Sequence, residues 1–254
     1  MEEPRQNSTF PVPLKSGLLV MVKDALDITG RMLNDKAEEL FRAGNIKYDN
    51  HDYTGAITDY SKAIELNPDY ADAYFKRGIT RNDIGDYMGS IADFNEVIRL
   101  NPAFSDAYLN RGISKHDLND YPGALEDYRK ALELNPDYSV AYYNSGIIKY
   151  AIGDANGALE DYNKAIELNP YFEDAFNNRG IIRINTKDYL RAIEDFDRII
   201  ELNPNYAFAY NNRGFAKKMI QDYKDAILDF RKAIRLRPGF EEAFYNLNDT
   251  FNLI

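Results

Sequence analysis

Cysteine and tryptophan are absent from this sequence of 254 residues, and histidine occurs only twice. Without cysteine the chain can form neither disulfides nor thiolate metal sites, and this fits a reducing compartment. His51 and His116 have no serine, cysteine or histidine partner at the spacing of a known catalytic motif. The HExxH and EF-hand spacings of zinc and calcium sites are also missing. We therefore expect that the protein is not an enzyme and that it binds neither a metal ion nor a cofactor.

Long hydrophobic runs are absent too. The longest, Leu18 to Val22, is far too short to span a bilayer. The acidic start, Met1-Glu2-Glu3, differs from the basic start of a signal peptide. We therefore expect a cytoplasmic protein without a membrane segment. With 44% hydrophobic and 28% charged residues, the chain nevertheless has enough apolar material to fold.

A 34-residue period runs through the sequence. It is marked by prolines at Pro68, Pro102, Pro136, Pro170, Pro204 and Pro238. A fixed period of this length is typical of solenoids, in which each unit covers the apolar face of its neighbour. Counting Ala37 as position 1, position 8 is always glycine and position 20 is always alanine or serine, while position 24 is always tyrosine or phenylalanine. This pattern predicts two closely packed helices in each repeat, called here helix A and helix B.

The pattern resembles the tetratricopeptide repeat (TPR). In the fourth repeat, the family's large, small, aromatic and proline positions are occupied by Tyr142, Gly146, Ala158, Tyr162, Ala165 and Pro170. Val97 and Ile199 depart from the family's small residue at position 27. The resemblance implies an all-α, right-handed superhelical solenoid of antiparallel helix pairs. Six repeats are expected, at residues 37–70, 71–104, 105–138, 139–172, 173–206 and 207–240.

The segments outside the repeats have their own signals. Residues 1–15 contain three prolines and are expected to form a flexible tail, whereas apolar spacing predicts an extra helix over residues 16–36. That helix would cap the first repeat or make a dimer or docking contact, and the tail could instead occupy the groove. Residues 241–254 are predicted to form a capping helix that packs through Phe244, Leu247 and Phe251.

Basic residues recur on helix A and could suggest nucleic-acid binding. They stand at position 11 in every repeat and at position 7 in four, whereas position 23 on helix B is always aspartate. A recurrent base matched to a recurrent acid predicts a ladder of ion pairs between the two helices. The formal net charge of −10 also repels a phosphate backbone, so we expect no nucleic-acid partner.

The resemblance implies that positions 2, 5, 6, 9, 12 and 13 of helix A face a groove. Asparagines recur there at Asn110, Asn144, Asn178 and Asn212, and at Asn177 and Asn211. Beside them stand Ile79, Ile113, Ile147, Ile181 and Phe215, together with Tyr143. A side-chain amide both donates and accepts, so this row could bind the backbone of an extended peptide. The alternative is that these amides bond neighbouring helices or water.

These patterns favour a non-enzymatic scaffold that binds an extended peptide segment of a partner protein. Acidic groove residues at Asp106, Asp117 and Asp174 favour a basic partner. The family's clamp for a terminal carboxylate is not expected, because among the five positions that would form it in the first three repeats only Asn45 has the required residue. A structural role with self-association through the outer faces and the N-terminal helix is the alternative.

Overall fold

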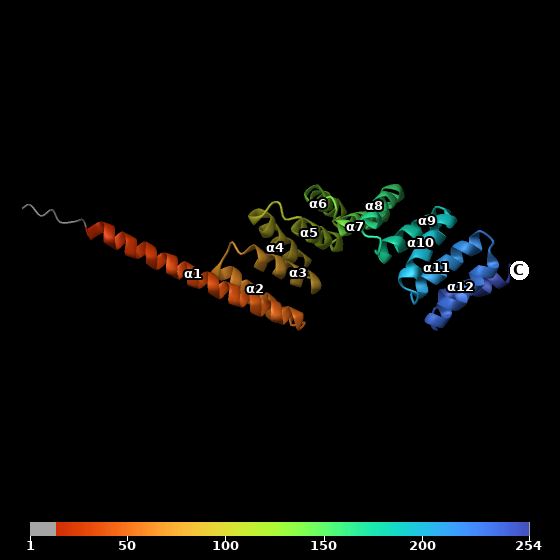
Figure 1. Cartoon of the computed structure of the whole chain (residues 1–254), viewed down its shortest axis with the longest axis horizontal. Coiled ribbons are helices and arrows are strands. Elements are labelled where there is room, and N and C mark those ends of the chain that lie inside the picture. The colour runs from red at the N-terminus through yellow and green to blue at the C-terminus, as the bar shows by residue number, and fades with distance from the viewer. Residues whose placement is uncertain (1–13, 254) are drawn as a thin grey trace, which may run out of the picture. The chain divides into compact units, whose positions relative to one another are not determined.

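The computed structural model describes residues 14–253, and every regular element in that range is a helix. The helices are α1 (Leu14–Asp49), α2 (Tyr53–Leu66), α3 (Ala71–Asp83), α4 (Tyr87–Leu100), α5 (Ser105–Asp117), α6 (Tyr121–Leu134), α7 (Ser139–Ala151), α8 (Ala155–Leu168), α9 (Glu173–Asn185), α10 (Tyr189–Leu202), α11 (Ala207–Met219), α12 (Tyr223–Leu236) and α13 (Glu241–Phe251). They follow one another in tandem pairs, which confirms the predicted all-α repeat architecture (Figure 1). Among the described residues, those up to Pro102 form one compact unit and those from Ala103 form a second.

The turn within each repeat is set by local chemistry. The residue that ends the turn is an aspartate in all six repeats. In five of them, Asp188 being the exception, its side chain accepts a hydrogen bond from a backbone N–H in the first turn of helix B, as Asp120 does from Gly123 at 3.1 Å. Just before it, the chain adopts a positive φ, for example 89° at Gly153. The aspartate satisfies a backbone donor that the helix start leaves unpaired, and this fixes where helix B begins.

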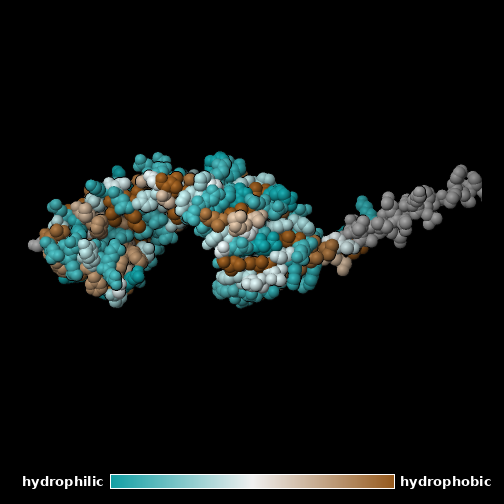
Figure 2. Space-filling view, turned by 180° about the vertical axis from the view of Figure 1, so that it is seen from behind, coloured by the Kyte–Doolittle hydropathy of each residue, from teal (hydrophilic) through white to brown (hydrophobic). Residues whose placement is uncertain are grey.

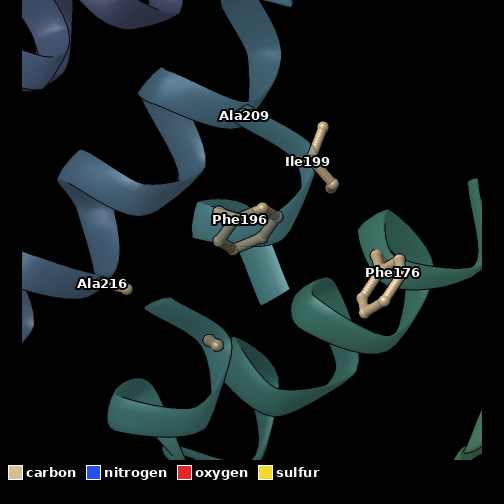
Figure 3. Packing of buried hydrophobic residues seen from close by; sticks show 6 residues of the cluster. Phe176, Phe196, Ile199, Ala209 and Ala216 are labelled. Atoms are coloured by element: carbon tan, nitrogen blue, oxygen red, sulfur yellow. The ribbon is translucent and has the colours of Figure 1, made fainter. Parts of the chain in front are cut away.

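Helix A and helix B pack closely through the glycine and the aromatic residue of each repeat. A Cβ built on Gly180 of α9 would lie 2.7 Å from Cζ of Phe196 on α10, so only glycine fits there. Phe196 is fully buried, and it forms a cluster with Phe176, Ile199 and alanines from α10 and α11 (Figure 3). Burial of one such ring contributes about 1.5–3 kcal/mol. The predicted close approach of the two helices is thus confirmed.

The N-terminal helix differs from the sequence expectation. Residues 16–36 are not a separate element, because α1 continues without a break into helix A of the first repeat. The residues around the predicted boundary, Asn34 to Leu40, include neither glycine nor proline, so nothing interrupts the helix there. Ile28 and Met32 are 57% and 66% exposed, and Figure 1 shows this part of α1 running past the end of α2. Most of the predicted tail, residues 1–13, lies outside the described residues.

The C-terminal helix α13 forms as predicted but packs through a different face. Ala243, Asn246 and Thr250 are buried, whereas Phe244 and Phe251 are 44% and 43% exposed. The two phenylalanines stand where helix A of a complete repeat would meet its helix B, and α13 is the last helix among the described residues. The expectation that they pack into the stack was therefore wrong for the two phenylalanines, whereas Leu247 is half-buried.

Candidate functional site

The basic residues of helix A lie against the aspartates of helix B. Ion pairs join Lys47 to Asp59, Arg77 and Arg81 to Asp93, Arg111 and Lys115 to Asp127, Lys149 to Asp161, Arg179 and Arg183 to Asp195, and Arg213 and Lys217 to Asp229, with nitrogen–oxygen distances between 2.5 and 2.9 Å. All six aspartates are buried. The predicted charge ladder is confirmed, and it occupies these cations inside the repeats.

Four of the predicted asparagines form a row on the helices A of the second unit, called here the amide row: Asn110, Asn144, Asn178 and Asn212. All four are half-buried. In Asn110 and Asn144 the amide nitrogen donates to a backbone carbonyl one turn earlier in the same helix, at 2.8 and 3.0 Å. This bond uses one of the two amide hydrogens. The second hydrogen and the amide oxygen of each side chain can therefore serve a ligand.

Asn178 and Asn212 are bonded within the row itself. The amide nitrogen of Asn178 lies 3.3 Å from the hydroxyl of Tyr143 and 3.5 Å from that of Tyr162, so it links α7, α8 and α9. The oxygen of Asn178 accepts a hydrogen bond from Asn177 at 3.4 Å, and Asn212 accepts one from Asn211 at the same distance. The alternative expected from the sequence, bonding to neighbouring helices, therefore describes part of the row.

Asn211 differs from its predicted role. It is only 1% exposed, donates to Glu242 at 3.0 Å and accepts from Asn246 at 3.0 Å. These bonds tie α11 to α13, because each partner belongs to the last helix. We do not expect Asn211 to contact a ligand.

A pocket of 170 Å³ lies between Asn178 of the amide row and two of the predicted groove isoleucines, Ile147 and Ile181. It is lined by Ile147, Tyr150, Tyr162, Asn178 and Ile181, which come from α7, α8 and α9. Three of these residues were predicted groove residues. Tyr150 was missed although it stands at groove position 12, and Tyr162 was read as a packing residue only. Ile113 and Phe215 are half-buried on α5 and α11, and Ile79 is half-buried on α3 of the first unit.

Two tyrosines of this region, Tyr143 and Tyr162, are held as neutral hydroxyls. Burial raises the pKa of Tyr162 to about 12. Burial also raises the pKa of Tyr143, and the nearby carboxylate of Asp174 adds to this effect. Tyr143 packs its ring 4.7 Å from that of Phe172, measured between centroids. The hydroxyls therefore stay protonated at neutral pH and keep the neutral hydroxyl's ability both to donate and to accept.

Acidic side chains stand at the edge of the amide row. Asp174 and Asp117 are exposed, while Asp106 is half-buried and accepts a hydrogen bond from the hydroxyl of Tyr138 at 2.8 Å.

Within residues 14–253, no group of three or more histidines, aspartates or glutamates is placed to hold a metal ion. Over the same residues, no helix has the length and hydrophobicity needed to cross a bilayer. Figure 2 shows apolar side chains in separate patches on a largely hydrophilic face.

Comparison with known families gives several matches over the repeats. A family described as "TPR repeat" matches residues 44–82 and 146–186. Two families described as "Tetratricopeptide repeat" match residues 105–138, and residues 173–206 and 209–240. Together these matches cover well over half of the chain. No curated protein sequence matches it.

Solved structures with a similar fold include three informative examples. A structure of MamA has 26% sequence identity and a TM-score of 0.60, covering 65% of this chain and 96% of that one. YrrB, described as a TPR protein with an unusual peptide-binding site, has 22% identity and a TM-score of 0.63, covering 73% and 96%. The pilF protein of Pseudomonas aeruginosa has 16% identity and a TM-score of 0.73, covering 85% and 99%. At these identities the similarity concerns the fold.

Proposed function

The chain belongs to the tetratricopeptide repeat family, and we propose that it binds an extended segment of a partner protein along the amide row of the second unit. The tetratricopeptide repeat is a non-catalytic interaction fold, so a protein-interaction scaffold is the general function that the family supports. The observation that carries the finer proposal is the 170 Å³ pocket, in which apolar side chains and the amide of Asn178 meet.

The asparagines of the amide row and the isoleucines of the pocket would recognise different parts of a ligand. Asn110 and Asn144 each keep one amide hydrogen and the amide oxygen available, so they can bond the N–H and C=O groups of a peptide backbone. Ile147 and Ile181 would take an apolar side chain in the pocket. Because backbone groups are common to all sequences, this arrangement would tolerate many ligand sequences.

The charge of the groove would add a preference for basic ligands. The carboxylates of Asp117 and Asp174 are exposed beside the amide row. They favour ligands that carry lysine or arginine, and they would accelerate association at low ionic strength. The partner expected from this site is thus an extended, basic protein segment with an apolar side chain for the pocket.

The proposal is tested with a ligand selected from a displayed library of linear peptides and measured by isothermal titration calorimetry. Asn144→Ala should weaken binding by about 0.5–1.5 kcal/mol, the net value of an ordinary hydrogen bond. Its melting temperature should stay close to that of wild type, because Asn144 bonds only its own helix among the described residues. Asn205→Ala, in an exposed turn outside the row, is the matched control.

Two outcomes of this titration would contradict the proposal. Equal affinity of wild type and Asn144→Ala would show that the amide row does not hold the peptide. Equal weakening by Asn144→Ala and Asn205→Ala would show that the loss has no connection with the row.

Self-association through α1 is the second candidate function. Ile28, Met32 and Leu33 are 57%, 66% and 42% exposed on a part of α1 that runs past α2 (Figure 1). Exposed apolar side chains at this density favour an interaction surface. Sedimentation velocity of the intact chain decides this candidate, since a monomer at micromolar concentration would exclude it.

A further inference from the structure

Arginine at position 7 of helix A links three helices in the second, fifth and sixth repeats. Arg179 of α9 bonds Asp195 of α10 through Nε and Nη2, at 3.1 and 2.5 Å, and its Nη1 donates to Asn163 of the preceding α8 at 2.7 Å. Arg213 does the same with Asp229 and Asp197, and Arg77 with Asp93 and Ser61. Arg111 bonds Asp127 in the same way. The guanidinium thus fills the space between consecutive repeats.

The fourth repeat has serine at this position. Ser145 of α7 is buried, and its side chain is too short to reach the aspartate of helix B as the arginines do. Asp161 keeps its place on α8, and its ion pair within the described residues is with Lys149, at 2.7 Å. Of the five repeats that follow another repeat, the fourth alone lacks the arginine.

A pocket of 460 Å³ opens where that arginine would lie. Leu125 and Leu132 of α6 form an apolar wall, and Ser145, Lys149 and Asp161 line the other side. Arg129 and Glu133 stand at the same pocket. It shares no residue with the 170 Å³ pocket of the amide row, although both use α7.

We propose that this pocket binds an arginine side chain of a partner protein, whose guanidinium takes the place of the missing arginine of the fourth repeat. The planar guanidinium would donate two parallel hydrogen bonds to the carboxylate of Asp161, as Arg111 and Arg213 do to their aspartates. The aliphatic part of the ligand would lie along Leu125 and Leu132. Lysine fits less well, because its ammonium lacks the fork geometry.

The charges around the pocket permit a second cation. Lys149 already bonds Asp161, but in the third and sixth repeats a lysine and an arginine share one aspartate in the same way, at Asp127 and Asp229. The guanidinium of Arg129 is 57% exposed and pairs with Glu126 and Glu133. Its positive charge is therefore balanced by two carboxylates, one of which stands at the pocket.

The test uses the blocked probe Nα-acetyl-arginine methylamide, titrated into the isotope-labelled intact chain and followed by amide chemical shifts. Saturable shifts are expected around Leu125, Ser145 and Asp161, with a dissociation constant in the millimolar range. The citrulline analogue has the same shape without the charge, and it should bind at least about tenfold more weakly.

Two variants locate the site. Ser145→Arg should fill the pocket as the other repeats do and abolish the shifts, while Ser145→Ala should preserve them. Should Ser145→Arg fail to fold, Asp161→Asn removes the charge without filling the pocket and should weaken binding at least about tenfold.

Several results would overturn the proposal. These are the absence of saturable shifts in wild type, shifts that persist in Ser145→Arg or Asp161→Asn, and equal binding of the citrulline probe. Free L-arginine is titrated as a last comparison. If it bound more tightly than the blocked probe, the pocket would be assigned to a free amino acid and not to a partner's side chain.

Discussion

The charge ladder makes a quantitative prediction, because its six aspartates differ in how many cations they hold. Asp195 is 1% exposed and bonds Arg179 and Arg183. Asp161 is 8% exposed and pairs with Lys149. Replacement by asparagine keeps the shape of the side chain but removes its charge. The cations that were paired with the carboxylate then stay partly buried without their partner.

The expected loss of unfolding free energy follows from the number of cations that each aspartate holds. Removing one member of a buried ion pair costs about 3–5 kcal/mol, and we expect Asp195→Asn to fall in this range because two arginines lose their partner. Asp161→Asn should cost only about 1–3 kcal/mol, since one lysine is affected and its side chain is 28% exposed. Glu194→Gln, next to Asp195 but exposed, should change the free energy of unfolding by less than about 0.5 kcal/mol.

The assay is urea unfolding followed by circular dichroism, together with amide hydrogen exchange of α9 and α10. Exchange is needed because long repeat arrays lose cooperativity, so a local loss can escape a global melt. Equal losses from Asp195→Asn and Asp161→Asn would refute the reasoning, because the number of buried cations would then have no effect. So would a loss from Asp195→Asn no larger than that of the Glu194→Gln control.

Two further predictions concern glycine and tyrosine. Gly180→Ala should destabilise the chain by about 1–3 kcal/mol, because the new Cβ would overlap Phe196, whereas Gly30→Ala, with nothing within 4 Å, should stabilise it by up to about 1 kcal/mol. Thermal melts that move in the same direction for both variants would contradict this. Burial raises the pKa of Tyr60 and Tyr162 to about 12. Because tyrosines of the unfolded chain already ionise near pH ~10, the stability that these two contribute is present below pH ~10. It is lost between pH ~10 and 12. Tyrosinate absorbance and circular dichroism, recorded together, check it: ionisation of all tyrosines near pH ~10 without unfolding would show the shift to be absent.

The features that recur with the period were predictable from the sequence. Gly180 and Phe196 are separated by the same interval as their counterparts in every other repeat, so their contact follows from one local geometry used six times. The pairing of Arg179 with Asp195 follows in the same way. Repetition supplies the information that a single pair of residues could not.

The features that depend on an interruption of the period were not predictable in the same way. Phe244 and Phe251 were expected to pack, but the helix that would cover them is not among the described residues. The bonds of Asn178 and Asn211 depend on side-chain rotamers and on the register between neighbouring repeats, which the spacing does not specify. Serine at position 145 was visible in the sequence, but the pocket beside Asp161 became apparent only in the structure.

The ladder also bears on the charge of the partner. Its ion pairs use ten cations and six carboxylates, all within the repeats. More positive than negative charge is therefore held inside, and the remaining surface is more acidic than the net charge of −10 suggests. We expect such a surface to repel nucleic acid and to attract basic segments. A basic ligand at the amide row and an arginine at the pocket beside Ser145 both agree with this field, and association with such a partner should slow as salt screens it.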